Sequence, residues 1–597
     1  MKNKITKITT SILDKVIIIY FIFLAGCFIT NYSFILKDSI TNLSTIGMGF
    51  ILLLSIRWFI DKQSFSNSIF IKFLRYLAGL NDKVLLALIF VISMSVFFQI
   101  GLFRHFAFSS GMDMGAADQA IWNTIHKGGI LFTSLPGNIN YLGAHFSLIL
   151  LLIAPFYLIG DGAIILIFLQ AAAIGISIFP LYLIAKQRLN NRLLVFVFIF
   201  AFFLSKPLRG VGLLDFHADV FLIPLVFTSY YLLITKRIFW AVSAIILMLC
   251  CKESAAILVF AYGIFTITYL KRYYLGASLL ALGIGWWVTV TNLIMPHLAY
   301  TESYPYINWL PFGTTYTDNL LAIIKNPSLP IKLFFSSETI EYCVKFFVPL
   351  GLLSFLSPQH YILFLLPLAF NILGGIHHGG MITITSHYPA QVLPFIFISA
   401  IYGAGKLIDL LNIKLNNRNI AKKNPFFMVW ESIKHFPTTE NSTKSNLKSH
   451  LSKVNFLVGA MIILLSLGFF GKSDGHKLSK FIYSTNALHS NEIRRALKKI
   501  PQEASVSAVH RITPHLAHRK YLYLWENNLD TRYLVEYVVL HRQLIEKDKE
   551  HFDQTIIKLK EKGFEEIYRD KHEELYILFN SKYKKENLKD IQRKILL

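Results

Sequence analysis

Four short polar groups interrupt an otherwise apolar sequence, and each holds side chains capable of chemistry. In the first, GMDMGAADQAIWN, Asp113 is suited to cap a short helix that begins at Met114. Asp118 and Trp122 then lie one turn apart on one face of that helix. Asp113 is either no more than a cap, with Asp118 a solvated charge, or a carboxylate beneath an outer cavity that accepts a proton or holds a metal.

Two further groups lie at the ends of apolar runs. LLDFHADV places Asp215, His217 and Asp219 in steps of two residues. In an extended turn these side chains would converge on a divalent metal, and a solvated turn is the alternative. Lys252 and Glu253 lie at a break between two apolar runs. They either neutralise each other or place Lys252 to meet a lipid-linked phosphate.

The fourth group, HHGGMITITSHYPAQ, contains His387 and Tyr388, and another histidine, His145, opens a further apolar run. Histidines at such positions either pack at an interface or join a site. The sequence has no P-loop, dinucleotide-binding glycine pattern or HExxH motif, and its four cysteines form no disulfide framework or metal-spaced set. Gln170 is the conspicuous polar residue deep within a run, so the relay of buried charges that a proton-coupled transporter needs is missing.

Apolar runs must position all four groups. Of the 597 residues, 54% are hydrophobic and 16% are charged, with a mean hydropathy of +0.51, whereas soluble domains have about 25% charged residues. Many runs are long enough to span ~30 Å of hydrocarbon as a helix. The chain is therefore predicted to be a mainly α-helical, polytopic membrane protein. About thirteen spans are expected, near 13–36, 44–61, 83–102, 163–185, 190–205, 218–234, 238–251, 254–270, 273–294, 341–357, 359–375, 389–411 and 454–471.

The charge distribution sets the expected topology. The formal charge of +24 would suit nucleic acid, but the basic residues gather between apolar runs, as in cytoplasmic loops, and no nucleic-acid partner is expected. The loop 412–453 has eight Lys and Arg residues against two acids. The basic clusters fall on one side of the membrane only if the apolar stretch 145–160 is a half-embedded helix that does not cross. The expected topology is that of a multi-pass cell-membrane protein with a cytoplasmic N-terminus and an extracytoplasmic C-terminus.

Five segments follow from this topology. Residues 1–80 would hold two extra N-terminal transmembrane helices, the first a retained span rather than a cleaved signal, and a cytoplasmic loop. The transmembrane core, 81–411, includes a large first outer loop at 103–162. After it come the basic cytoplasmic loop 412–453, a last transmembrane helix at 454–471 and an extracytoplasmic tail at 472–597. The tail is predicted to be a small α/β domain, with a helical stretch at 542–562 and strands at 505–509, 521–525, 533–540, 565–568 and 574–579.

Taken together, the four groups resemble the prokaryotic membrane family called domain of unknown function 2079. The family pattern is FDxGxxxQxxWN, then H-x-S with an apolar L-x-x-P run, D-x-H at the mouth of a span, K-E at a break and a late H-Y. The matching residues are Asp113, Gly115, Gln119, Trp122, Asn123, His145, Ser147, Pro155, Gln170, Pro180, Asp215, His217, Lys252, Glu253, His387 and Tyr388. Met112 departs from the aromatic of the pattern, and Ser254 from its usual Asp or other small polar residue. The resemblance covers roughly 80–470, and PxxASVSA…PHLAHR (501–519) is similar to the region that follows the membrane core.

That family is similar in layout to the GT-C glycosyltransferases, which transfer a sugar from a polyprenyl-phosphate carrier with inversion at the anomeric carbon. The resemblance implies a GT-C-like fold and an extracytoplasmic glycan, lipid or protein as acceptor. Asp113 would be the general base, and Asp118 would orient the substrate or bind a metal. Lys252, with Glu253 and His217, would hold the phosphate of the carrier, whose charge grows as it leaves.

Further residues are implied for the same outward-facing cavity. They are Gln119, Trp122, Asn123, His145, Asp215, Asp219, His387 and Tyr388. A divalent metal, if one is used, would be held by Asp113, Asp118, Asp215 and His217. Two other classes of function stay open: a non-catalytic lipid carrier, flippase or transporter whose cavity only houses a polyprenyl chain, and a membrane scaffold whose outer tail recruits partners.

Overall fold

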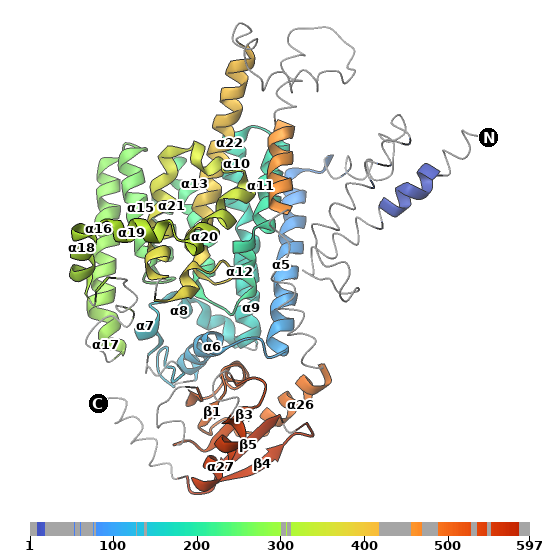
Figure 1. Cartoon of the computed structure of the whole chain (residues 1–597), viewed down its shortest axis with the longest axis vertical. Coiled ribbons are helices and arrows are strands. Elements are labelled where there is room, and N and C mark those ends of the chain that lie inside the picture. Colours follow the sequence, from blue (N-terminus) through green and yellow to red (C-terminus); the bar gives the residue numbers. More distant parts are fainter. Residues whose placement is uncertain are drawn as a thin grey trace.

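The computed structural model describes most of the chain from residue 79 onward. The described residues are 9–17, 79–126, 128–135, 140–160, 162–299, 315–375, 377–416, 455–467, 487–526, 534–545, 551–572 and 574–583, with a few isolated positions. The expected spans 13–36 and 44–61 lie mostly outside these residues, as does the basic loop beyond Asn416. A bundle of helices occupies one part of the molecule, and a small domain with a sheet lies at one end of it (Figure 1).

Four described helices are long and apolar enough to cross a membrane. They are α5 (Asp82–Phe106), α9 with α10 (Gly162–Ile176 and Ile178–Leu189), α16 with η3 and α17 (Tyr273–Thr289, Val290–Ile294 and Met295–Ala299), and the first part of α22 (Leu393–Asn416). A fifth span is formed if α11 (Arg192–Leu204) and α12 (Lys206–Leu213) are counted together, with a bend of 52° between them. Ser205 lies at this bend in an extended conformation, and Pro207 follows within the first turn of α12.

Shorter apolar helices occupy several other predicted runs. They are η2 with α13 (Ala218–Phe221 and Leu222–Ile234), α14 (Ile238–Leu249), α15 (Ala255–Thr268) and Asn455–Leu467. A helix of 12 residues, such as α14, is about 18 Å long and does not by itself match ~30 Å of hydrocarbon. Most of the described helices lie where the apolar runs predicted them. By length and composition, however, the described residues contain four or five full spans, fewer than the expected thirteen.

Two apolar stretches are not continuous helices. The predicted span 341–357 is interrupted: α20 (Ser337–Phe347) ends in a short turn, and Gly351 and Leu352 both have positive φ angles of 63° and 56°. A left-handed pair stops a helix, so hydrophobicity alone gave a wrong prediction there. After the interruption at 341–357 the chain continues in α21 (Tyr361–Gly374). The second stretch, 145–160, forms only α8 (Ile149–Ile153) and η1 (Ala154–Leu158), which are too short to cross the membrane.

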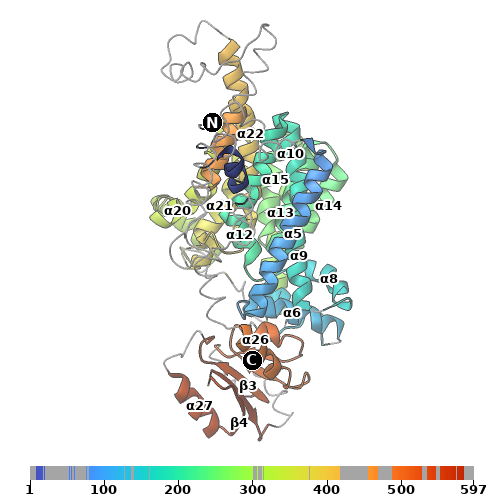
Figure 2. The same ribbon diagram turned by 90° about the vertical axis from the view of Figure 1, so that its right-hand side faces the viewer.

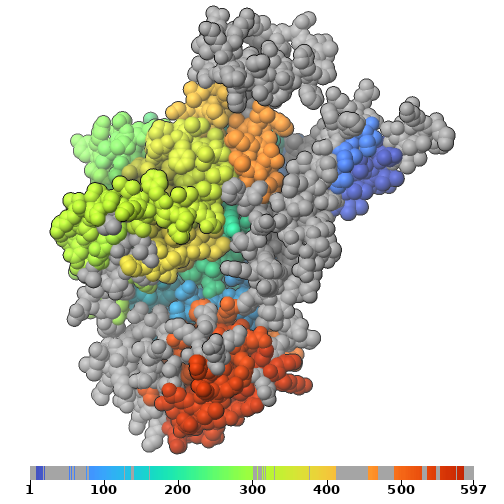
Figure 3. Space-filling model, viewed as in Figure 1, coloured from blue at the N-terminus to red at the C-terminus, as the bar shows by residue number. Residues whose placement is uncertain are grey.

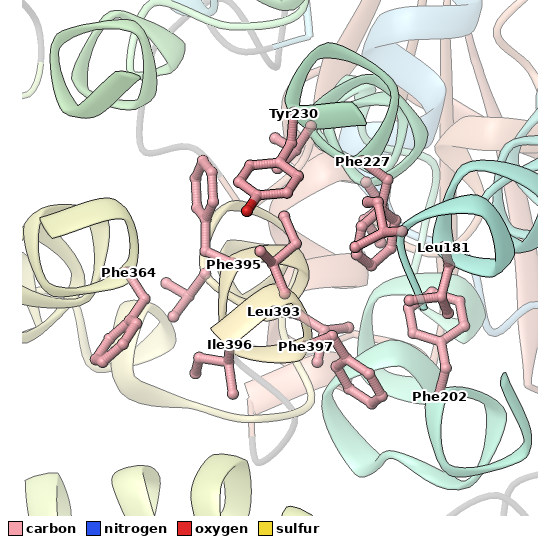
Figure 4. Close-up of a cluster of buried hydrophobic side chains, with 14 of the residues drawn as sticks. Leu181, Phe202, Phe227, Tyr230, Phe364, Leu393, Phe395, Ile396 and Phe397 are labelled. Carbon is pink, nitrogen blue, oxygen red and sulfur yellow. The ribbon is translucent and has the colours of Figure 1, made fainter. Parts of the chain in front are cut away.

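A packed aromatic and aliphatic core holds the bundle together. Figure 4 shows Tyr230 and Phe227 of α13, Phe202 of α11 and Phe397 of α22 converging from different helices, and all are buried. The rings of Phe202 and Phe397 meet edge to face, with centroids 5.4 Å apart. Because this core fixes α11, α13 and α22, it also fixes the short segments between them that hold the candidate residues.

The described part of the C-terminal domain contains a five-stranded mixed sheet and two α-helices, α26 (Ala487–Leu497) and α27 (Phe552–Glu561). The strands are β1 (Val506–Ala508), β2 (Leu522–Leu524), β3 (Tyr537–His541), β4 (Phe564–Arg569) and β5 (Leu575–Asn580), in the order β2-β1-β3-β5-β4. β1 pairs in parallel with β2 and β3, and β5 pairs antiparallel with β3 and β4. The predicted strands and final hairpin are confirmed. Within the predicted helical stretch 542–562, the structure has the helix α27.

This domain shares a hydrophobic core with the membrane part. Ile121 of α6 (Met112–Ile125) and Leu135 belong to the same buried cluster as Val506, Ile512 and Leu516 of the tail. Both ribbon views place the domain directly against α6 (Figures 1 and 2), and in the space-filling view it closes one end of the molecule (Figure 3). The tail is therefore docked on the segment that contains the first polar group.

Candidate functional site

The first polar group begins α6, but Asp113 is not its cap. The helix starts at Met112, and its N-cap residue is Gly111, which has no side chain to accept a capping hydrogen bond. Asp215 supplies the missing acceptor, because its Oδ2 accepts a hydrogen bond from the Gly111 N–H at 2.5 Å. His510 of the C-terminal domain accepts from the Met112 N–H through Nε2 at 3.3 Å. Two remote segments thus cap α6, and Asp113 lies in its first turn, where the helix dipole favours a carboxylate.

Asp113 pairs with His217. Their Oδ2 and Nε2 atoms are 3.4 Å apart, and the His217 Nδ1–H donates to the backbone carbonyl of Asp215 at 2.9 Å. Burial lowers the pKa of His217, but the hydrogen bond and charge of Asp113 outweigh it, and the pKa lies above the ordinary value. Burial raises the pKa of Asp113, and the hydrogen bond and charge of His217 reverse this shift, so that the pKa lies well below its ordinary value. Each partner thus favours the charged form of the other, and about half of the Asp113 side chain (49%) remains exposed.

His217 is connected to the buried Lys252 through His387. The imidazole rings of His217 and His387 are stacked, with centroids 3.8 Å apart, and the Nε2 atom of His387 is 3.2 Å from the Lys252 Nζ. The same Nζ donates to both carboxylate oxygens of Asp219, at 3.1 and 3.2 Å. Lys252 also lies 4.9 Å from the ring centroid of Tyr388. These contacts connect an exposed carboxylate to a buried ammonium through two rings.

Asp219 and Lys252 form a buried ion pair, with only 3% and 6% of their side chains exposed. Gln391 donates to Asp219 Oδ1 at 3.3 Å and to the Ser254 Oγ at 2.8 Å. Gln391 and Ser254 were not among the predicted site residues. The signal available was their position. Gln391 ends the fourth polar group, two residues before the apolar helix α22, and Ser254 directly follows the Lys-Glu pair.

The segment around His145 is tied to the break that holds Lys252. The Phe146 N–H donates to Glu253 Oε2 at 3.1 Å, and the Ser147 Oγ donates to the Cys251 carbonyl at 2.8 Å. Burial and the charge of Lys252 lower the pKa of His145 to about 3. His145 is therefore neutral, and its ring stacks on Tyr306 at 5.4 Å. Glu253 acts as an anchor for this loop, which brings His145 close to the site.

The remaining residues of the first group face the C-terminal domain. Five residues along a helix correspond to a rotation of about 140°, so Asp118 points away from the side that Asp113 uses. Asp118 is buried, and its Oδ1 lies 3.2 Å from His518 Nε2. Gln119 donates to the carbonyls of Arg519 and Lys520, at 3.0 and 3.2 Å.

Trp122 and Asn123 complete this second face of α6. Trp122 stacks on His126, with ring centroids 4.3 Å apart, and Asn123 donates to the Phe132 carbonyl at 3.0 Å. The structure thus brings together Asp113, Asp215, His217, Asp219, Lys252, His387 and Tyr388, with Glu253 and His145 beside them. Asp118, Gln119, Trp122 and Asn123 lie instead where α6 and its loop meet the tail.

The expected metal ligands do not converge. Asp118 lies on the other face of α6, and Asp215 is engaged with the Gly111 N–H. Within the described part of the chain, no three His, Cys, Asp or Glu side chains are grouped so as to hold a metal ion. The described donors therefore do not fit a divalent cation at this site.

Comparison with known proteins places the chain in a wider context. Residues 104–573 match the family model described as "Predicted membrane protein (DUF2079)". No curated protein matches the chain. A structure of ArnT from Cupriavidus metallidurans bound to undecaprenyl phosphate is similar at 12% identity and a TM-score of 0.45, covering 83% of this chain and 98% of that chain. The apo structure of the same protein is similar at 11% identity and a TM-score of 0.41, covering 78% and 93%. Similarity at this level indicates neither a shared site nor a shared substrate.

Proposed function

This chain belongs to the membrane protein family DUF2079, and from the arrangement of its polar residues we propose that it is a glycosyltransferase-like membrane enzyme. It transfers a sugar from a polyprenyl-phosphate donor to an acceptor hydroxyl outside the cytoplasm, with inversion. The observation that supports this proposal is the contact chain from Asp113 through His217 and His387 to Lys252. It places an exposed carboxylate and a buried cation on either side of two imidazoles.

Asp113 is suited to be the general base. It is ionised, and its exposed half leaves room for an acceptor hydroxyl. A carboxylate with so low a pKa is a weak base in water, but an acceptor that displaces water from its exposed half raises that pKa. The hydroxyl proton then passes to Asp113 as the oxygen attacks the anomeric carbon. His217 holds the carboxylate in position through Nε2.

Lys252 and His217 supply positive charge for the leaving group. As the new bond to the acceptor oxygen forms, the bond from the anomeric carbon to the phosphate oxygen breaks, and polyprenyl phosphate leaves with an additional negative charge. A fixed ammonium stabilises that charge more in a dry site than in water. Asp219 and Gln391 keep the ammonium in place when no donor is bound.

The proposal includes an orientation. The C-terminal domain contacts the same helix, α6, that bears Asp113, so the domain and the site belong to one side of the membrane. The basic excess of the loop 412–453 supports a cytoplasmic position for that loop and an extracytoplasmic position for the tail. Acceptors are then glycans, lipids or proteins of the cell envelope.

The test is transfer of radiolabelled sugar from polyprenyl-phosphate donors by purified full-length protein in lipid. Asp113→Asn keeps the shape of the side chain and removes the base, so transfer is expected to fall by about 10²–10⁴. Asp553→Asn, on the exposed surface of α27, is the matched control and should leave the rate unchanged. A wild-type rate in Asp113→Asn would exclude Asp113 as the base. No transfer by wild type from any donor, together with movement of lipid across the bilayer, would favour a carrier.

A further inference from the structure

A hollow lies between α6, the end of α5 and the C-terminal domain. Its volume is 590 Å³, and its walls come from His105 and Phe106, from Asp118, from α26 and from the segment 514–519. Asp113 and Asp118 point about 140° apart around α6, so this hollow and the Asp113 site lie on different sides of the helix. The proposed transfer reaction uses no residue that lines it.

The lining of this hollow is strongly basic. Arg494, Arg495, Lys498 and Arg519 face a single carboxylate, Asp118, which already pairs with His518. Among the residues that the structure describes, no carboxylate forms an ion pair with Arg494, Arg495 or Lys498. Three cations without an ion-pair partner among the described residues thus border one concavity, which is the arrangement that recognises a multiply charged anion.

Two of the lining groups are already positioned for a ligand. Arg494 donates to the Asn491 side chain, and its guanidinium lies 4.7 Å above the ring of Phe106, which fixes the plane of its donors. His515 stacks on His105 at 4.3 Å, and its Nε2 is buried without a hydrogen-bond partner in the described part of the chain. Buried polar atoms are rarely left unpaired, and a bound oxygen would satisfy this one.

The position of the hollow indicates which kind of anion it would bind. Phe106 is the last residue of the membrane-crossing helix α5 and is 38% exposed, and Ala163 is the second residue of the next span. The hollow therefore borders on the depth at which acyl chains meet their headgroups. Its volume exceeds by far the ~30 Å³ of a water molecule, and it accommodates a phosphorylated headgroup.

From these observations we propose that the hollow binds the phosphate-bearing headgroup of a membrane lipid. The site is separate from the Asp113 site and does not depend on the proposed transfer reaction. Because α26 and the segment 514–519 belong to the tail whereas His105 and Asp118 belong to the membrane part, the bound headgroup bridges the two parts.

The first experiment titrates inorganic pyrophosphate into full-length protein in zwitterionic nanodiscs at constant ionic strength. The triple variant Arg494→Gln/Arg495→Gln/Lys498→Gln should bind at least about tenfold more weakly than wild type. Lys558→Gln/Lys571→Gln/Lys582→Gln removes the same charge from exposed positions of the same domain that do not line the hollow, and should bind as wild type does. Equal affinities of wild type and the first triple variant, or an equal loss in both triple variants, would overturn the site.

Lys498→Gln alone provides a variant whose folding is not in question, because this side chain is exposed, and it should weaken binding by a few-fold. Asp113→Asn should bind pyrophosphate as wild type does, which keeps this test independent of transferase activity. The second experiment measures, by native mass spectrometry, the phosphatidic acid retained after extraction from mixed bilayers. Wild type should retain more than the first triple variant. Equal retention with intact pyrophosphate binding would overturn the assignment to a lipid and indicate a water-soluble phosphate.

Discussion

Asp113 and His217 stabilise each other's charged form, and this gives the site a defined pH dependence. The pKa of His217 is raised above 6.5, so its contribution to folding is complete below that pH and disappears as the pH rises through the higher folded-state pKa. The pKa of Asp113 is lowered, so its contribution is present above 3.8 and disappears as the pH falls through the lower folded-state value.

His217→Gln should therefore destabilise the protein most between pH 4 and 6.5, and the difference from wild type should shrink as the pH rises further. Thermal unfolding in detergent over this pH range measures the effect. His551→Gln, at an exposed position of the tail, serves as the matched control. A constant difference between wild type and His217→Gln at all pH values would show that the pair is not charged.

Lys252 has a structural role as well as the proposed phosphate-binding role, and the two can be separated. Lys252→Met leaves the buried Asp219 unpaired, which should destabilise the protein by about 3–5 kcal/mol. Lys252→Met/Asp219→Asn removes both charges and should recover most of that stability. Binding of polyprenyl phosphate should stay weak in the double variant. Normal binding by a stable double variant would mean that Lys252 only supports the fold.

Helix α6 shows how one element serves two purposes. Its N-terminus is capped by Asp215 and His510, while its opposite face anchors the tail through Asp118 and Gln119. At Gly111 an added Cβ would collide with the imidazole of His510. The backbone φ there is −119°, so the glycine is required by this close approach rather than by backbone strain.

Gly111→Ala should thus push His510 away and cost about 1–3 kcal/mol of stability, with a loss of transferase activity. Gly111→Ala/His510→Ala should recover part of the stability, because the second substitution removes the clashing ring. Gly285→Ala, in α16 with nothing within 4 Å of the added carbon, is the matched control and should be neutral or slightly stabilising. If the double variant is no more stable than Gly111→Ala, contact with His510 is not the reason for the glycine.

At the scale of the whole molecule, the tail contributes a helix-capping residue and backbone hydrogen bonds to the membrane part. His510 contributes to the cap beside Asp113, and Ser134 exchanges hydrogen bonds with both backbone groups of Leu522, at 2.6 and 2.9 Å. The domain and the segment that contains Ser134 are therefore joined by buried polar contacts as well as by a shared core. This docking requires that the tail and the Asp113 site face the same compartment.

Cysteine labelling in intact cells checks which compartment that is. In a background without the natural cysteines, Lys558→Cys on the exposed side of α27 should react with a membrane-impermeant maleimide. Ser442→Cys in the basic loop should react only after permeabilisation, because its loop has the excess of positive charge typical of the cytoplasmic side. The reverse pattern would invert the topology and exclude an extracytoplasmic acceptor.

The sequence by itself determined the features that depend on local pattern. Apolar runs placed most of the helices, strand-like runs placed the strands of the tail, and the four polar groups contained most of the residues of the site. The family resemblance that these groups indicated is confirmed by the match over residues 104–573. Each of these signals lies within a few neighbouring residues, which is why a single sequence suffices for them.

The tertiary structure decided the features that depend on the rotation of side chains around a helix, on the sign of the backbone φ angle and on contacts between residues remote in sequence. The turn of α6 separates Asp118 from Asp113, and the left-handed pair at Gly351 and Leu352 interrupts an apolar run that hydrophobicity could not distinguish from a span. The partner of Lys252 is Asp219, 33 residues away, and the helix cap comes from His510, 398 residues away. Spacing along the chain does not encode such contacts, because they form only when packed helices bring their ends together.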